Sequence, residues 1–134
     1  MKLYVDTNIF LDCLVERQNI FGKDISPPAQ KIFSRAIKCE FHIVFSDHTA
    51  KELAKNIKLE NARMLFELLK KKIIQVKYTK EDEDEARKLC PAHYEDALHA
   101  ILANKHGADF LVTRNVTHFV KYCSLIKTKR PEEL

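Results

Sequence analysis

Five short runs of apolar residues place the strongest constraint on how this chain can fold. Each run is continuous rather than alternating, and segments with a helical spacing of apolar residues separate the runs. Continuous apolar runs are typical of strands buried on both faces, which occur in parallel sheets covered by helices. The predicted strands are residues 3–5, 42–45, 73–76 and 110–113, with a short fifth strand at 125–126. We therefore predict a three-layer α/β/α sandwich around a central parallel sheet of four to five strands.

Apolar spacing and capping residues predict helices between these strands. One helix should begin after Asp6, and a polar loop should follow it from Glu16 to Asp24. Further helices are predicted at residues 26–39, around 46–57, at 59–71, from 79 or 80 to before Pro91, and at 93–105. Gly107 stands where a residue in the left-handed conformation would end the last of these helices.

Length and composition favour a single domain over residues 1–134. With 134 residues and 46% hydrophobic content, the chain can bury one core but is too short for two ordinary domains. No apolar run approaches the roughly 18 residues of a membrane span, and no signal segment precedes the first run. We therefore expect a cytoplasmic protein without a membrane partner. The four cysteines lack zinc-finger spacing and are expected to be buried thiols, and the net charge of +4 permits a polyanionic partner.

Acidic residues follow or precede the predicted strands at positions that should meet at one edge of the sheet. Asp6 follows the first strand, Glu52 lies in the helix after the second, and Asp96 lies near the start of the helix before the fourth. In open α/β sheets, ligands bind at the carboxyl ends of the strands. Each acid also has an alternative, purely structural interpretation. Asp6 or Asn8 could cap a helix, Thr49 and Glu52 match a capping box, and Asp96 suits a helix dipole.

The junction after the fourth strand adds other polar groups to the same edge. Thr113, Arg114, Asn115 and His118 bring hydroxyl, guanidinium, amide and imidazole groups. This clustering favours a functional site over separate helix caps. Arg114 is a candidate for phosphate contact, because a guanidinium matches phosphate oxygens bidentately, with a surface salt bridge as the alternative.

Four sequence blocks, in this order and spacing, together resemble the PIN domain family. The blocks are Val5-Asp6-Thr7-Asn8, then Ser46 with Glu52-Leu53, then Glu95-Asp96-Ala97-Leu98-His99-Ala100 with Gly107-Ala108-Asp109, and last Leu111-Val112-Thr113-Arg114-Asn115 with His118-Phe119. PIN domains are metal-dependent nucleases that act on RNA or structured nucleic acid. Small prokaryotic members are often VapC-type ribonuclease toxins, which an antitoxin protein neutralises.

The resemblance implies roles for individual residues and partners. Asp6, Glu52 and Asp96 fall on the family's metal-site acids, for which Mg²⁺ or Mn²⁺ is the expected cofactor. It further implies an RNA substrate, an antitoxin partner and a homodimer. Many PIN domains carry a fourth acid in the last block, where this chain has Asn115 and His118. The alternative is therefore a PIN-like module that binds RNA or a partner protein without cleaving.

Other classes of α/β protein fit the sequence less well. A receiver domain needs an aspartate after the third strand, and a haloacid-dehalogenase-type phosphatase needs a second acid where Asn8 stands. A nucleotide-binding loop needs more glycines than Gly22 and Gly107. His99, one turn after Asp96, could be a ligand, but a position on the helix surface is the expected one, and the resemblance gives it no catalytic role. The aromatic residues Phe110, Phe119 and Tyr122 are expected in the core.

Overall fold

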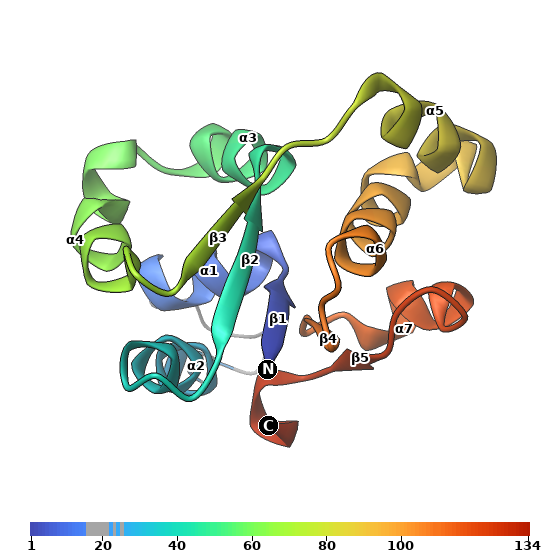
Figure 1. The fold of residues 1–134 in the computed structure, drawn as a ribbon. Coiled ribbons are helices and arrows are strands. Elements are labelled where there is room, and N and C mark those ends of the chain that lie inside the picture. The colour runs from blue at the N-terminus through green and yellow to red at the C-terminus, as the bar shows by residue number, and fades with distance from the viewer. Residues whose placement is uncertain (16–21, 23, 25) are drawn as a thin grey trace.

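The computed structural model of the protein describes residues 1–15, 22, 24 and 26–134. β1 (Lys2–Val5), β2 (His42–Ser46), β3 (Ile73–Val76), β4 (Phe110–Val112) and β5 (Thr128–Lys129) form one sheet (Figure 1). All pairs are parallel, and the strand order is β3-β2-β1-β4-β5. The predicted fold class is confirmed. The loop predicted from Glu16 to Asp24 lies mostly outside the described residues.

Helices connect the strands close to the predicted positions. They are α1 (Thr7–Val15), α2 (Ser26–Ile37), α3 (Asp47–Asn56), α4 (Leu59–Leu69), α5 (Lys80–Leu89), α6 (Tyr94–Lys105) and α7 (Val116–Phe119), with short 3₁₀ turns η1 (Pro91–His93), η2 (Val120–Tyr122) and η3 (Pro131–Glu133). Gly107 follows α6 with a φ of 71°, as predicted. Among the described residues, no helix is long and apolar enough to cross a membrane.

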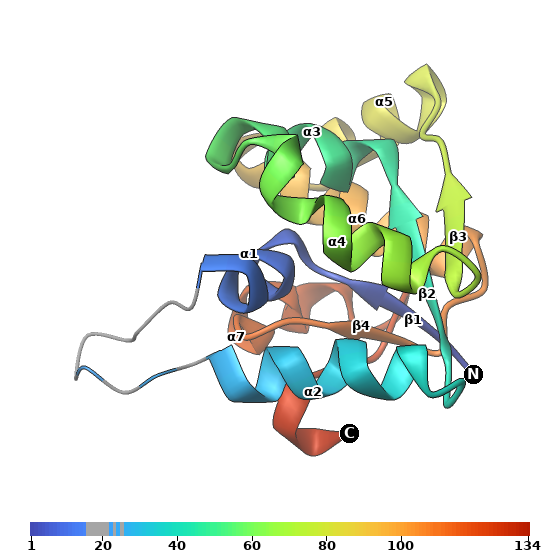
Figure 2. The ribbon, with the colours of Figure 1, turned by 90° about the vertical axis from the view of Figure 1, so that its left-hand side faces the viewer.

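The helices cover both faces of the sheet. α1, α2 and α4 lie on one side, and α5, α6 and α7 lie on the other (Figure 1). Figure 2 shows the first of these layers from the front. Leu3 and Val5 of β1 point into the core under α1, α2 and α4, whereas Tyr4 points into the core under α6. Because neighbouring strand residues enter opposite cores, β1 is apolar without interruption.

The chain changes direction across the sheet beside β1, and this change positions the candidate site. β2 and β3 lie on one side of β1, whereas β4 and β5 lie on the other. Val5 pairs with Val112, and the amide of Asp6 donates to the carbonyl of Val112 at 2.9 Å. A crevice at the carboxyl ends of the strands is expected at such a switch point. Asp6 therefore begins the segment that borders this crevice.

Two sequence-based predictions need correction. The fifth strand is Thr128–Lys129, not Leu125–Ile126. The amides of Leu125 and Ile126 both donate to the carbonyl of Tyr122, so these residues form a turn from which Ile126 enters the core. The cysteines are thiols, but none of the four is fully buried: Cys13 and Cys90 are half-buried, and Cys39 and Cys123 are exposed. Phe119 and Tyr122 are core residues as predicted, and Phe110 packs against the core while half-buried.

A capping box begins α5 and allows a direct test of local stability. The Thr79 hydroxyl accepts from the amide of Asp82 at 3.2 Å, and the Asp82 carboxylate accepts from the amide of Thr79 at 2.9 Å. We expect Thr79→Ala to lower the free energy of unfolding by about 1 kcal/mol, because amides at the helix start lose their partner. Urea denaturation measures the change, with Ser34→Ala on the exposed face of α2 as the control. An unchanged denaturation midpoint for Thr79→Ala would contradict the expectation.

Candidate metal centre

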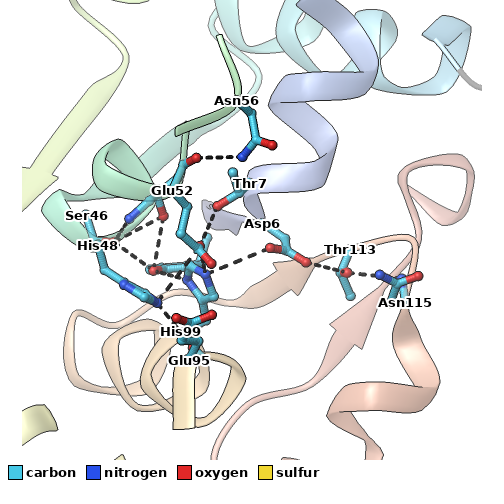
Figure 3. A network of polar contacts seen from close by, with 12 residues as sticks. Asp6, Thr7, Ser46, His48, Glu52, Asn56, Glu95, His99, Thr113 and Asn115 are labelled. Atoms are coloured by element: carbon cyan, nitrogen blue, oxygen red, sulfur yellow. Dashed lines mark hydrogen bonds and ion pairs between the residues drawn. The ribbon is translucent and has the colours of Figure 1, made fainter. Parts of the chain in front are cut away.

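Asp6 is held at the carboxyl edge by the neighbouring strand. It follows β1, and its side chain is mostly buried. Its Oδ2 accepts a hydrogen bond from the Thr113 hydroxyl at 2.8 Å (Figure 3). Thr113 is fully buried just after β4, and its hydroxyl also accepts from the amide of Asn115 at 3.1 Å. Thr113 therefore fixes one carboxylate oxygen of Asp6, while Oδ1 remains directed toward the centre of the site.

Glu52 points toward Asp6 from the second turn of α3 (Figure 3). The capping-box interpretation of Glu52 is wrong, because Ser46 caps this helix by accepting from the amide of Thr49. Glu52 Oε1 instead accepts from the Thr7 hydroxyl at 2.7 Å and from His99 Nε2 at 2.5 Å. Burial tends to raise the pKa of Glu52, but the bonds from His99 and Thr7 outweigh burial and lower the pKa to about 2. Glu52 is therefore a carboxylate at neutral pH.

Asp96 belongs to the same electrostatic cluster. It lies in the first turn of α6 and is half-buried. Burial raises its pKa, and the negative charges of Asp6 and Glu52 raise it further, against the opposing effects of His99 and His118. Asp96 also borders a cavity of about 460 Å³ together with His118. The three acids predicted from the sequence thus influence one another across the edge of the sheet.

His99 is a buried part of this cluster, so the predicted surface location is wrong. Its side chain is only 2% exposed, and α6 is buried without interruption from Ala97 to Ala103. Nδ1 lies 2.7 Å from the Tyr4 hydroxyl, which in turn lies 2.8 Å from the Ser46 hydroxyl. Burial opposes a charge on His99, but Tyr4, Glu52 and Asp6 together raise its pKa well above the usual value. The small and apolar residues on every face of α6 were the signal for this burial.

His48 is the other residue that sequence reasoning did not place at the site. It lies one turn before Glu52 on α3, and its Nε2 is 3.9 Å from Glu52 Oε1. The same nitrogen is 3.3 Å from the carbonyl oxygen of Glu95, and the rings of His48 and His99 are 4.4 Å apart. Burial, followed by the positive charge of His99, lowers the pKa of His48 to about 4. His48 is therefore neutral when His99 is charged.

The lowered pKa of His48 predicts a pH-dependent stability of the metal-free protein. The unfolded chain takes up this proton near pH 6.5, whereas the folded protein does so near pH 4. The contribution of His48 to stability is therefore fully present above pH 6.5 and is lost as the pH falls toward 4, on the order of 3 kcal/mol. Chemical denaturation with a chelator present should show a smaller loss over this range in His48→Gln than in the unchanged protein. The exposed histidine variant His42→Gln should behave like the unchanged protein, and parallel losses in all three would contradict the assignment.

The remaining predicted residues surround the three acids. Asn8 Oδ1 is buried and has no hydrogen-bond partner among the described residues. Arg114 forms a bidentate ion pair with Asp12 of α1 through Nε and Nη2. The pair therefore matches the salt-bridge interpretation of Arg114, except that Asp12 is fully buried rather than on the surface. Asn115 is half-buried, and His118 is exposed at the cavity that borders Asp96.

The chemistry of these side chains fits a divalent cation. Among the described residues, no lysine or arginine forms an ion pair with Asp6, Glu52 or Asp96. His99, whose pKa is raised, compensates part of the negative charge from 2.5 Å and 4.0 Å away from Glu52 and Asp6. The hydrogen bonds to Asp6 and Glu52 end on Oδ2 and Oε1. Asp6 Oδ1 and Glu52 Oε2 accept none of these hydrogen bonds and can therefore serve as ligands. Oxygen ligands are those that Mg²⁺ and Mn²⁺ prefer.

Comparisons with known proteins agree with this fold. The chain matches the family model of the PIN domain over residues 2–117. Its structure is similar to a chain in the crystal structure of VapBC2 from Rickettsia felis bound to a DNA fragment from their promoter, with a TM-score of 0.64 and 18% sequence identity. The similarity covers 97% of this chain and 98% of that chain. No curated protein sequence matches significantly. The match over most of the chain shows that this protein belongs to the PIN domain family.

Proposed function

We propose that this protein is a metal-dependent endoribonuclease that hydrolyses phosphodiester bonds in RNA. One observation carries the proposal: two carboxylates approach the same ring nitrogen. Asp6 Oδ1 and Glu52 Oε1 lie 4.0 Å and 2.5 Å from His99 Nε2. Asp96 is a third acid in the first turn of α6, and burial together with the charges of Asp6 and Glu52 raises its pKa. Three acids gathered where parallel strands end suit phosphodiester hydrolysis, in which a cation must be held against a phosphate.

Asp6, Glu52 and Asp96 would hold Mg²⁺ or Mn²⁺ in this proposal. A bound divalent ion supplies charge neutralisation for the phosphate and lowers the pKa of a water molecule to be used for attack. Asp6 would contribute Oδ1, because Thr113 occupies Oδ2. Glu52 would either ligate the ion or accept a proton from the attacking water, and the bonds from Thr7 and His99 would keep its carboxylate oriented.

Polar groups around the acids would position the RNA backbone. Asn8, Asn115 and His118 would contact phosphate or water, while Thr113 keeps Asp6 in place. Arg114 would act mainly as an anchor, since its guanidinium already binds Asp12. The exposed Lys55 on α3 could attract the RNA backbone by charge alone.

We further propose that the protein is a VapC-type toxin of a single domain, residues 1–134, and works on RNA in the cytoplasm. The similar VapBC2 structure supports an antitoxin as partner. The surface near α4 offers a place for an antitoxin or for the second copy in a homodimer. Met64 and Leu68 are 77% and 57% exposed there, and a groove of about 530 Å³ is lined in part by Phe45 and Phe66. Exposed apolar groups of this kind are typical of protein interfaces.

A second candidate function is an RNA-binding or protein-binding module without cleavage. The observation that favours it is the last block, where Asn115 and His118 supply no fixed negative charge. A site with fewer acids attracts a second cation less strongly, which would weaken catalysis that uses two ions.

Cleavage of a labelled single-stranded RNA pool tests the two functions against each other. The purified protein should cut the RNA with Mg²⁺ or Mn²⁺ and should stop when EDTA is added. Binding of the same RNA should be measured by anisotropy under the same conditions. RNA binding without cleavage by a well-folded protein, equal with and without EDTA, would support the binding module and contradict the nuclease.

A further inference from the structure

We propose that His48, Glu52 and His99 form a second cation site that takes a borderline divalent metal of the zinc class. This site goes beyond the proposed nuclease function. It shares Glu52 with the proposed nuclease site but uses neither of that site's other acids, Asp6 and Asp96. The ligand atoms of the three residues all lie within 4.8 Å of one another. Two histidines and a glutamate are a donor set that proteins use for zinc.

The backbone positions the three donors on facing helices. His48 and Glu52 are four residues apart on α3 and therefore lie on the same helix face. His99 faces them from α6 (Figure 3). The observed separations from Glu52 Oε1 are 2.5 Å to His99 Nε2 and 3.9 Å to His48 Nε2. A four-coordinate zinc ion with bonds of about 2.0–2.1 Å holds its ligand atoms about 3.3 Å apart, between these two values.

The surroundings of His99 favour metal binding through Nε2, whereas His48 Nε2 would have to leave the carbonyl oxygen of Glu95, 3.3 Å away. His99 Nδ1 lies 2.7 Å from the Tyr4 hydroxyl, and the Tyr4 hydroxyl lies 2.8 Å from that of Ser46. A partner on the other ring nitrogen is the arrangement that orients histidine ligands in metal sites. Both histidine side chains are at least nine-tenths buried, so their ring orientations are already restricted. Imidazole suits zinc, nickel and copper, whereas Mg²⁺ prefers oxygen.

The shared glutamate connects the two sites. An ion bound between His48 and His99 would keep the Glu52 carboxylate beside the imidazoles, so that Glu52 would not be available to an ion held by Asp6 and Asp96. Zinc bound at His48 and His99 would then weaken the binding of Mg²⁺ at the acidic site. Zinc at low concentration should therefore compete with Mg²⁺ for the protein, because both sets of donors include Glu52.

Zinc binding to the reduced, full-length protein tests the proposal without any measurement of activity. Competition with a chromophoric chelator gives the Zn²⁺ affinity, and Co²⁺ absorption in the visible range reports the coordination. His48→Gln should weaken Zn²⁺ binding by at least about 100-fold. Replacing a residue that only hydrogen-bonds to a metal ligand already lowers metal affinity by about 10–100-fold, and a direct ligand should matter at least as much. His42→Gln replaces an exposed histidine at the start of β2 and should bind as the unchanged protein does.

Further measurements separate this site from the nuclease site. Asp6→Asn should keep its Zn²⁺ affinity even if RNA cleavage is lost or was never present. In the unchanged protein, ¹⁵N spectra of the imidazoles should show Zn²⁺-dependent shifts for His48 and His99 but not for His42, which covers the case that His48→Gln does not fold. The proposal is overturned if Asp6→Asn loses Zn²⁺ binding while His48→Gln keeps it. A sulfur-to-cobalt absorption band would also overturn it, because the ion would then be on a cysteine.

Discussion

Replacing Asp6 by asparagine is expected to lower the rate of RNA cleavage about 1,000-fold, because a metal ion stabilises the transition state by several kcal/mol and depends on this carboxylate. The substitution removes the negative charge but keeps the shape of the side chain. The asparagine oxygen can still accept the hydrogen bond from the Thr113 hydroxyl that now ends on Asp6 Oδ2. The fold should therefore survive the change.

Single-turnover cleavage with saturating Mg²⁺ measures the effect, and a thermal melt checks the fold. Asp84→Asn is the matched control, since it makes the same chemical change at an exposed position of α5. It should cleave at the rate of the unchanged protein. Cleavage by Asp6→Asn at that same rate would remove Asp6 from the mechanism.

The largest expected effect on stability comes from Arg114→Met. Asp12 is fully buried, and both of its oxygens contact the guanidinium of Arg114. Methionine would fill part of the space but would leave the Asp12 carboxylate without its guanidinium partner. Removing one partner of a fully buried ion pair lowers the free energy of unfolding by about 3–5 kcal/mol, and because the Arg114 side chain is 30% exposed we expect a loss of at most about 3 kcal/mol. Urea denaturation should show this loss as an earlier midpoint.

Two comparisons show whether the loss arises from the buried charge. Adding Asp12→Asn to Arg114→Met should restore part of the stability, because the carboxylate is then neutral. Arg87→Met removes an arginine that pairs with Glu83 on an exposed face of α5, where solvent screens the pair, and its effect should be small. Equal midpoints for Arg114→Met and the unchanged protein would show that the ion pair does not stabilise the fold.

The carboxyl edge of the sheet was predictable because it depends only on the order of strands and helices. Once the apolar runs are assigned to parallel strands, Asp6 and Thr113 must follow two of them on the same side. The hydrogen bond between these two residues agrees with that reasoning. Their roles in catalysis stay proposals, as do those of Glu52 and Asp96.

The histidines could not be placed in the same way. His99 was expected on the surface of its helix, but α6 is buried without interruption from Ala97 to Ala103. Its contact with Glu52 joins α6 to α3, and no sequence pattern within either helix predicts that these two side chains meet. His48 poses the same problem, since its place beside His99 depends on how the two helices pack. Packing of separate elements decides such contacts.

The prediction of the fifth strand was wrong for a different reason. Leu125 and Ile126 are apolar and were therefore assigned to the sheet, yet Thr128 and Lys129 form the strand. β5 pairs on one side only, with β4, so its residues need not be apolar. A polar edge strand also resists pairing with other chains. Periodicity alone cannot separate a buried turn from a buried strand.

The central place of β1 also has a consequence for synthesis of the protein on the ribosome. β1 is translated well before its partner β4, which lies at residues 110–112, and the bond from Thr113 to Asp6 spans 107 positions. Chains are made from the amino terminus, and pairings between distant segments wait for the later one. A nascent chain that stops before β4 would therefore carry Asp6 and Glu52 without the strand that joins them to the rest of the sheet. Any activity of this centre would begin only after β4 has been synthesised.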